Sequence, residues 1–242
     1  MNHLKLFPIS LNNKCGFINK HGDIVIKPQF DYVWEFSEEL AAVENDQKWG
    51  FIDEKGTIKI KLKYDYARFF IGGVARVREY DRYFLIDKQD SPITEKQFER
   101  IRYCYDGMIQ VRLNRKWGFI DRKGRLVVKP QFNSCGRFSE GLAYVEVNGK
   151  YGFINKTGEI VIEPTFDSVQ SFSEGLACVK LGEKYGYINK SGETIIDPKY
   201  EIGLDFHNGL AQIEINKKVG YINNKGEIVI EPQFDLGATL SG

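Results

Sequence analysis

The chain has 242 residues, of which 42% are hydrophobic, and its formal net charge is +1 at pH 7. This length allows one large all-β domain or two small ones, with a sizeable buried core. The four cysteines, Cys15, Cys104, Cys135 and Cys178, form no C-x-x-C pair, which excludes a disulfide framework and a zinc site and predicts reduced thiols. No apolar run suits a signal peptide or a membrane span, so we expect a cytoplasmic protein.

A glycine recurs on a 34-residue register along nearly the whole chain, and a fixed period of this size indicates an array of like units. Phe84 takes the place of the glycine in the third copy. The glycines of the register are Gly16, Gly50, Gly118, Gly152, Gly186 and Gly220. We expect a single repeat domain over 1–242, with units at about 4–30, 31–64, 65–98, 99–132, 133–166, 167–200 and 201–235.

Each unit is predicted to be a three-stranded antiparallel meander. Taken in chain order in the fifth unit, the expected elements are a strand over 142–147, a hairpin turn at Asn148-Gly149, a strand over 151–155, a turn over 156–158 and a strand over 160–163. Pro164 is expected to end the third strand, because proline has no backbone N–H to donate. Glycine and proline every ten residues or so, with an apolar period of two, exclude the helical repeats that share this spacing.

Both faces of the predicted sheet are apolar, so the sheets should be sandwiched between their neighbours. Such sheets close into a propeller-like ring or continue as an open β-solenoid. An open array needs polar caps, whereas the first unit begins with Leu4, Leu6 and Phe7 and the last retains Ile230 and Phe234. The apolar ends favour the ring, and the open superhelix is the alternative.

The phrases Trp49-Gly50-Phe51-Ile52-Asp53-Glu54-Lys55-Gly56 and Trp117-Gly118-Phe119-Ile120-Asp121-Arg122-Lys123-Gly124 resemble the bacterial WG repeat. The resemblance extends through Lys129-Pro130-Gln131-Phe132 and Phe138-Ser139-Glu140-Gly141-Leu142-Ala143 and covers nearly the whole chain. The third unit departs most, with Tyr83-Phe84 for Trp-Gly and Ser91-Pro92 in its third strand. The resemblance implies a β-rich interaction module, and it carries no established catalytic residues.

Two charged positions recur in nearly every unit, and a feature shared by all copies belongs to the scaffold. We therefore expect them to make turn and inter-unit contacts. The cations are Lys14, Lys48, Arg82, Lys116, Lys150, Lys184 and Lys218, and the acids are Asp31, Asp65, Glu99, Asp167, Glu201 and Asp235. The tryptophans Trp34, Trp49 and Trp117 are expected in the core.

We expect the binding surface at positions where the repeat units differ from one another, and arginine is the residue that distinguishes the central units. All eleven arginines lie between Arg68 and Arg137, where 11 Arg and 5 Lys against 8 acids leave a charge of +8. Arg68 and Arg102 stand where another copy has Gln170, and Arg78 and Arg112 stand where others have glutamate. The predicted partner-binding residues are Arg68, Arg76, Arg78, Tyr80, Arg100, Arg102, Tyr103, Tyr105 and Arg112. Arginine and tyrosine are enriched at protein-contact hot spots, although a solvated basic face is the alternative.

Catalytic constellations in the chain are weak. The histidines His3, His21 and His207 occur singly, and no nucleophile motif, phosphate-binding glycine loop or metal-spaced cluster is present. We therefore predict a non-catalytic scaffold, with no cofactor or metal, that binds a protein partner with an acidic surface. Nucleic acid or another anion is the alternative partner, and an enzyme with its site at a channel mouth is a third possibility.

Overall fold

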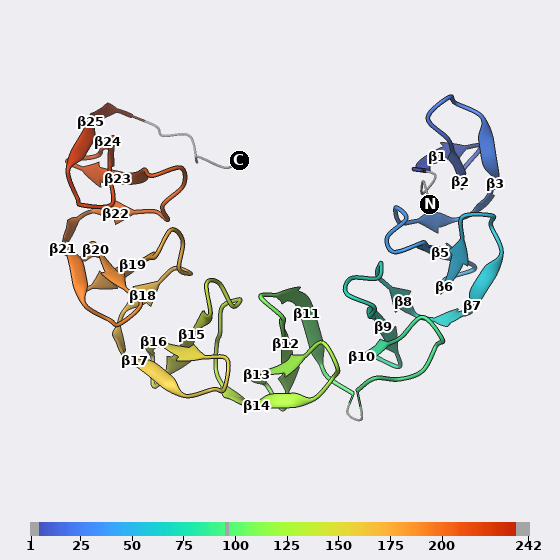
Figure 1. Ribbon diagram of the computed structural model, residues 1–242, viewed down its shortest axis with the longest axis horizontal. Coiled ribbons are helices and arrows are strands. Elements are labelled where there is room, and N and C mark those ends of the chain that lie inside the picture. Colours follow the sequence, from blue (N-terminus) through green and yellow to red (C-terminus); the bar gives the residue numbers. More distant parts are fainter. Residues whose placement is uncertain (1–4, 95–96, 236–242) are drawn as a thin grey trace. The chain divides into compact units, whose positions relative to one another are not determined.

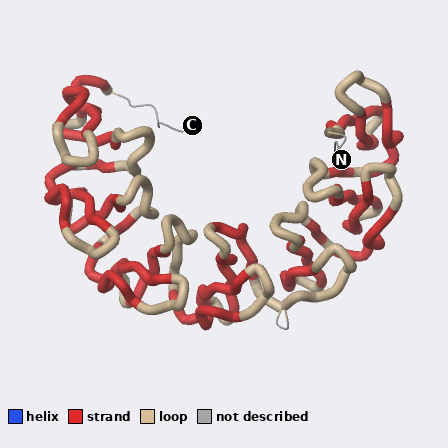
Figure 2. Tube along the Cα trace, in the orientation of Figure 1, coloured by secondary structure: helices blue, strands red, loops and turns tan. Residues whose placement is uncertain are grey.

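The computed structural model describes residues 5–94 and 97–235, and strands are its regular elements (Figures 1 and 2). Seven separate antiparallel sheets follow one another along the sequence. Within the described residues, no helix is long and apolar enough to cross a membrane. The expected all-β repeat class is therefore confirmed.

The strands fall into seven consecutive groups, which we call sheets 1 to 7. Sheet 1 contains β1 (Phe7–Leu11), β2 (Lys14–Ile18) and β3 (Ile24–Phe30). Sheet 2 contains β4 (Tyr32–Val33), β5 (Leu40–Asn45), β6 (Lys48–Asp53) and β7 (Ile58–Tyr64). Sheet 3 contains β8 (Tyr66–Ala67), β9 (Ala75–Glu79) and β10 (Arg82–Ile86). Sheet 4 contains β11 (Arg100–Tyr105), β12 (Met108–Leu113), β13 (Lys116–Asp121) and β14 (Leu126–Phe132).

The remaining three sheets repeat the same order. Sheet 5 contains β15 (Leu142–Val147), β16 (Lys150–Asn155) and β17 (Ile160–Phe166). Sheet 6 contains β18 (Ser168–Val169), β19 (Leu176–Leu181), β20 (Lys184–Asn189) and β21 (Thr194–Tyr200). Sheet 7 contains β22 (Ile202–Gly203), β23 (Ala211–Ile215), β24 (Lys218–Ile222) and β25 (Ile228–Phe234).

The segment between two meanders contributes a strand that the sequence pattern did not predict. In sheet 2, Tyr32 and Val33 pair antiparallel with Glu44 and Val43 of β5. The strand is too short to show an alternating pattern, which is why the meander alone was expected. Four sheets therefore have four strands rather than three.

In the five units whose third strand contains a proline (β3, β14, β17, β21 and β25), the strand runs through it, so the expectation that Pro164 ends the strand is wrong. Strand β17 continues to Phe166, and its register with β16 shifts between Tyr151 and Phe153. Gly152 lies at this irregularity, and a Cβ placed on it would meet the nitrogen of Pro164 at 2.7 Å. Because the proline sits at a bulge, its missing N–H removes no regular ladder hydrogen bond.

The expectation that both sheet faces are buried is wrong for the third strand. Ile160 and Val161 are 46% and 42% exposed, whereas Ile162 is buried. The third strand lies at the edge of its sheet, so neighbouring sheets cover only part of it. The first strand behaves as expected, because Leu142, Ala143 and Val145 are all buried.

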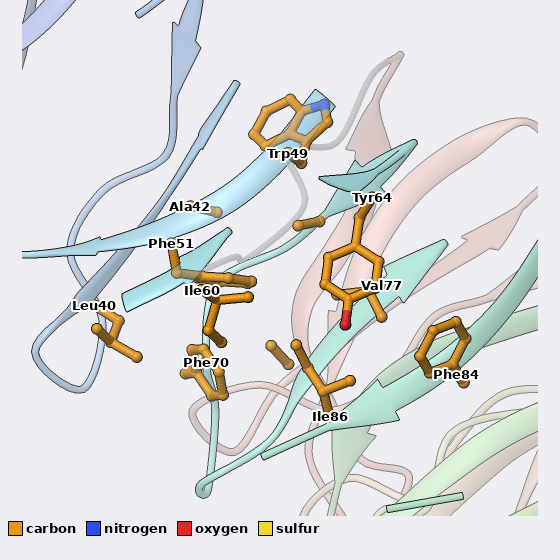
Figure 3. Close-up of a cluster of buried hydrophobic side chains, with 12 residues drawn as sticks. Leu40, Ala42, Trp49, Phe51, Ile60, Tyr64, Phe70, Val77, Phe84 and Ile86 are labelled. Atoms are coloured by element: carbon orange, nitrogen blue, oxygen red, sulfur yellow. The ribbon is translucent and has the colours of Figure 1, made fainter. Parts of the chain in front are cut away.

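The hydrophobic core lies between consecutive sheets. One cluster joins Trp49, Phe51 and Ile60 of sheet 2 to Val77 and Phe84 of sheet 3, as Figure 3 shows. Further clusters join sheets 1 and 2, 4 and 5, 5 and 6, and 6 and 7. Each sheet therefore depends on its neighbours for burial, as expected for a repeat array.

The chain divides into two compact units. The first comprises residues 1–102, 111–113 and 121–125, and the second comprises 103–110, 114–120 and 126–242. Sheets 1 to 3 lie in the first unit and sheets 5 to 7 in the second, while sheet 4 contributes residues to both.

Candidate functional site

The recurring cation and acid tie neighbouring sheets together, which confirms the expected inter-unit contacts. Lys14 of β2 donates from Nζ to Oδ1 of Asp31 at 2.5 Å, and Oδ2 of Asp31 accepts from the backbone N–H of Asp46 in the β5–β6 turn. The same ion pair recurs at Lys48–Asp65, Lys150–Asp167, Lys184–Glu201 and Lys218–Asp235. These charges are therefore part of the scaffold in these five copies.

Four of the predicted arginines line a single cavity in the first compact unit. Arg76 and Arg78 reach it from β9, and Arg100 and Arg102 reach it from the start of β11. The cavity has a volume of about 450 Å³. We call it the arginine cavity; its other lining residues are Asp81, Tyr83, Glu99 and Ile101.

Alternation along the two strands explains why the arginines gather. Arg76 and Arg78 flank Val77, which is fully buried on the opposite face of β9. In the same way, Arg100 and Arg102 flank Ile101, which is 2% exposed. Because successive side chains of a strand point to opposite faces, each buried residue directs two arginines to the other side.

Arg76 also connects two sheets. A terminal guanidinium nitrogen, Nη1, donates to the backbone carbonyl of Ile101, and the guanidinium lies 5.8 Å from the ring of Tyr66 and 5.5 Å from the ring of Tyr83. Cation–π contacts of this kind add to the hydrogen bond. Arg76 therefore builds the wall of the arginine cavity.

The connection made by Arg76 has counterparts made by neutral side chains in the second compact unit. Gln110 donates to the carbonyl of Cys135 at 3.1 Å, and Gln170 donates to the carbonyl of Gly203 at 3.3 Å. Ile101, Cys135 and Gly203 occupy the same position of the repeat. In these three copies the carbonyl accepts a hydrogen bond from a long polar side chain of the preceding sheet; Arg76 and Gln110 share one repeat position, whereas Gln170 stands at the position of Arg102.

Arg78 lies between two tyrosines in sheet 3. It pairs with Tyr66 of β8 on one side and with Tyr83 of β10 on the other. Within the part of the chain that the structure describes, the Nε of Arg78 is buried and has no hydrogen-bond partner. A buried donor of this kind favours a ligand that supplies an acceptor.

The other predicted residues lie outside the lining of the arginine cavity. The guanidinium of Arg68 stacks 4.2 Å from the ring of Trp34, and Arg112 lies 3.9 Å from Oε2 of Glu99. Tyr80 is at the tip of the β9–β10 turn, where it is 87% exposed. Tyr105, in the second compact unit, is 37% exposed and lies under the guanidinium of Arg137.

The side chain of the remaining predicted residue, Tyr103, lies outside the described part of the structure. Of the three tryptophans, Trp49 and Trp117 are buried as expected. Trp34 is half-buried and packs against the core cluster of sheets 2 and 3.

Sequence reasoning missed Tyr66 and Tyr83 beside the arginines, and Asp81 and Glu99 on the cavity wall. Tyr83 was noted only as a departure from the Trp-Gly pattern, and Glu99 only as a scaffold acid. Tyr83 and Tyr66 are the residues paired with Arg78 on the two neighbouring strands. The pairing with Tyr66 could not be predicted without knowing that β8 is a strand.

Outside the arginine cavity, titratable groups gather in the second compact unit, where burial raises the pKa of Asp205 to about 6 and Cys178, Tyr187 and His207 lie close enough to interact with its charge. The four cysteines are free thiols, and burial raises the pKa of Cys178 to about 12, which disfavours its nucleophilic thiolate. Among the described residues, no group of three or more His, Cys, Asp or Glu side chains is arranged to hold a metal ion.

A second cavity in the first compact unit carries the opposite charge. It has a volume of about 480 Å³, and Glu35, Glu38, Glu39 and Glu54 contribute to its lining together with Lys5 and Lys88. Glu38 accepts from the backbone N–H groups of Gly72 and Gly73, and Lys88 donates to its carbonyl. Part of this acidic surface therefore holds sheets 2 and 3 together.

The family model for the WG containing repeat matches the chain at residues 16–49, 49–83, 83–117, 117–151, 151–185, 185–218 and 220–236. The chain belongs to the WG-repeat family. The expected resemblance is confirmed, and the matched segments extend through the divergent third unit.

Solved structures support the fold of this WG-repeat chain. A eukaryotic initiation factor matches with a TM-score of 0.55 and 13% identity over 96% of this chain and 74% of that chain. BamB from Moraxella catarrhalis matches with a TM-score of 0.45 and 12% identity over 94% of this chain and 84% of that chain. Hsv2p from Kluyveromyces lactis matches with a TM-score of 0.44 and 9% identity over 78% of this chain and 73% of that chain.

At 13% identity, the initiation-factor match shows the fold alone. No curated protein matches the chain. The chain is thus an all-β repeat protein of the WG-repeat family, which is consistent with a non-catalytic repeat protein.

Proposed function

We propose that this WG-repeat chain is a non-catalytic scaffold that binds an acidic surface of a partner protein through the arginine cavity. The observation that carries the proposal is the gathering of Arg76, Arg78, Arg100 and Arg102 around one cavity beside Tyr83. Guanidinium groups bind carboxylates through a planar fork, and arginine with tyrosine is typical of contact hot spots.

The repeat itself suggests substitutions that the fold should accept. In other copies the positions of Arg78, Arg100 and Arg102 carry Glu44, Ser134 and Gln170. The triple variant Arg78→Glu, Arg100→Ser, Arg102→Gln therefore replaces each arginine by a residue already used at that place in a sheet. We expect it to fold and to lose the partner.

The control variant Lys55→Glu, Lys123→Thr, Lys225→Thr changes three exposed turn lysines and alters the net charge by the same amount. Affinity capture from cells of the source organism, with quantitative mass spectrometry, should recover a partner with the native chain and with the control but not with the arginine variant. A partner list common to all three chains would reject the proposal.

Salt dependence separates a protein partner from nucleic acid. A protein partner should bind with a defined stoichiometry, measured by analytical ultracentrifugation of the purified complex. Nucleic acid would bind across unrelated sequences and weaken steeply between 50 and 200 mM salt. That second result would identify the arginine cavity as a nucleic-acid-binding site and reject a protein partner.

A further inference from the structure

The four arginines of the arginine cavity do not have the same task. Arg76 donates to the carbonyl of Ile101 and packs between the rings of Tyr66 and Tyr83. It is therefore fixed by the scaffold. Arg78, Arg100 and Arg102 line the same cavity beside it.

These three guanidinium groups approach from two strands. Arg78 lies near the end of β9, whereas Arg100 and Arg102 lie two residues apart at the start of β11. Arg100 and Arg102 are exposed, and Arg78 is half-buried with an Nε that is buried and unpaired among the described residues. A bound group must therefore offer acceptors to forks that enter from different directions.

The charge of the cavity indicates how much negative charge it can hold. Four arginines against Asp81 and Glu99 leave two positive charges in excess. Glu99 also lies 3.9 Å from Nε of Arg112, so its charge is partly balanced outside the lining. A single carboxylate would leave the excess only half compensated.

We propose, building on the proposed function, that the arginine cavity binds the phosphate group of a phosphorylated side chain on the partner protein. A phosphate monoester carries about −1.5 to −2 charge at pH 7 and three acceptor oxygens in a tetrahedral arrangement. It can accept from several guanidinium groups at once, whereas a planar carboxylate accepts from one fork. Clusters of arginine are a recurrent means of recognising phosphorylated peptides.

The direct test uses three seven-residue peptides that differ only at the central residue, which is phosphoserine, glutamate or serine. Isothermal titration calorimetry with the full chain should show the phosphopeptide binding at least about tenfold more tightly than the glutamate peptide, because its charge and acceptor number are larger. Equal affinity for the phosphoserine and glutamate peptides would overturn the inference.

Two single variants distinguish an arginine that binds the ligand from one that holds the sheets together. Arg78→Glu should weaken phosphopeptide binding at least about tenfold, since it removes the buried donor and inverts the charge. Arg76→Gln should weaken it about threefold or less, because Gln110 shows that glutamine can make the same inter-sheet hydrogen bond. Phosphopeptide binding that survives Arg78→Glu unchanged would place the ligand elsewhere.

Two further measurements separate the source of the phosphate from the function itself. Adenosine monophosphate and inorganic phosphate are added as competitors; competition as strong as that of the phosphopeptide would overturn the assignment to a partner side chain. Phosphatase treatment of the cell extract before capture should abolish recovery of the partner. Recovery that resists phosphatase but still depends on the three arginines would reject the phosphate inference and leave the proposed function intact.

Discussion

The register glycine is required because a backbone passes next to it. A Cβ on Gly50 would meet the carbonyl oxygen of Ile60 at 2.4 Å and the nitrogen of Leu62 at 2.8 Å. Both atoms belong to β7, which is bulged opposite the glycine. Phe84 replaces the glycine in sheet 3, where the described residues after β10 pair with it through isolated bridges and form no continuous strand.

The Gly50→Ala variant should therefore be destabilised by about 1–3 kcal/mol, the usual range for a forced overlap in a packed region. Urea unfolding followed by circular dichroism measures the change. Gly149→Ala serves as the control, because Gly149 has a φ of 78° but open space around its Cβ position. If Gly50→Ala were no more damaging than the control, close approach would not explain the register.

At the scale of the element, the described residues of sheet 3 form no strand after β10, and isolated bridges and side-chain contacts are found there instead. Two isolated bridges, Tyr83 with Phe98 and Ile86 with Pro92, replace a continuous ladder. Asp90 accepts from the hydroxyl of Tyr64 and from Nζ of Lys63, each at 2.5 Å. The irregular segment of sheet 3 is thus held against the end of β7.

Removing the Tyr64 hydroxyl should loosen this segment. We expect Tyr64→Phe to lower the free energy of unfolding by about 1–2 kcal/mol, since the lost hydrogen bond is to a charged acceptor. Hydrogen exchange of the amides over 87–94 should become faster. Tyr200 occupies the equivalent position in sheet 6, and Tyr200→Phe should leave exchange over 87–94 unchanged; equal effects of both variants would contradict the role given to Asp90.

Much of each element could be predicted because local residues determine it. The turn at Asn148-Gly149 has both residues at positive φ, as its sequence requires. The short strand β4 and the continuation of β17 through Pro164 were missed, since both depend on a neighbouring strand rather than on their own residues. The gathering of Arg76, Arg78, Arg100 and Arg102 was predicted from differences among copies, while the stacking of Arg68 on Trp34 depended on contacts that no spacing reveals.

At the scale of the whole molecule, the repeated ion pairs make folding depend on pH. The Lys hydrogen bond lowers the pKa of Asp31, Asp65, Asp167 and Asp235 in the folded chain. A carboxyl group with a lowered folded pKa stabilises the fold above its unfolded value, near 4, and that contribution is lost as the pH falls through the folded pKa. The melting temperature should therefore decrease as the pH falls from 5 to 3.

A variant with all four aspartates changed to asparagine should melt lower than the native chain at pH 7, and its melting temperature should depend less on pH between 5 and 3. Differential scanning calorimetry at several pH values makes the comparison. Parallel curves for the native chain and the variant would mean that other carboxyl groups control acid unfolding.

Four expectations stay predictions: ring closure, the single domain over 1–242, the cytoplasmic location and the identity of the partner.

The carbonyl that accepts from Arg76 in one copy and from Gln110 in the next allows the charge of the donor side chain to change while the hydrogen bond between sheets is kept. A mutation at the donor position can replace a charged side chain by a neutral one without breaking the hydrogen bond between neighbouring sheets. Gene duplication followed by drift could thus give each copy its own binding chemistry while the array stayed assembled. The same tolerance would let an engineer rewrite the surface of one sheet at a time.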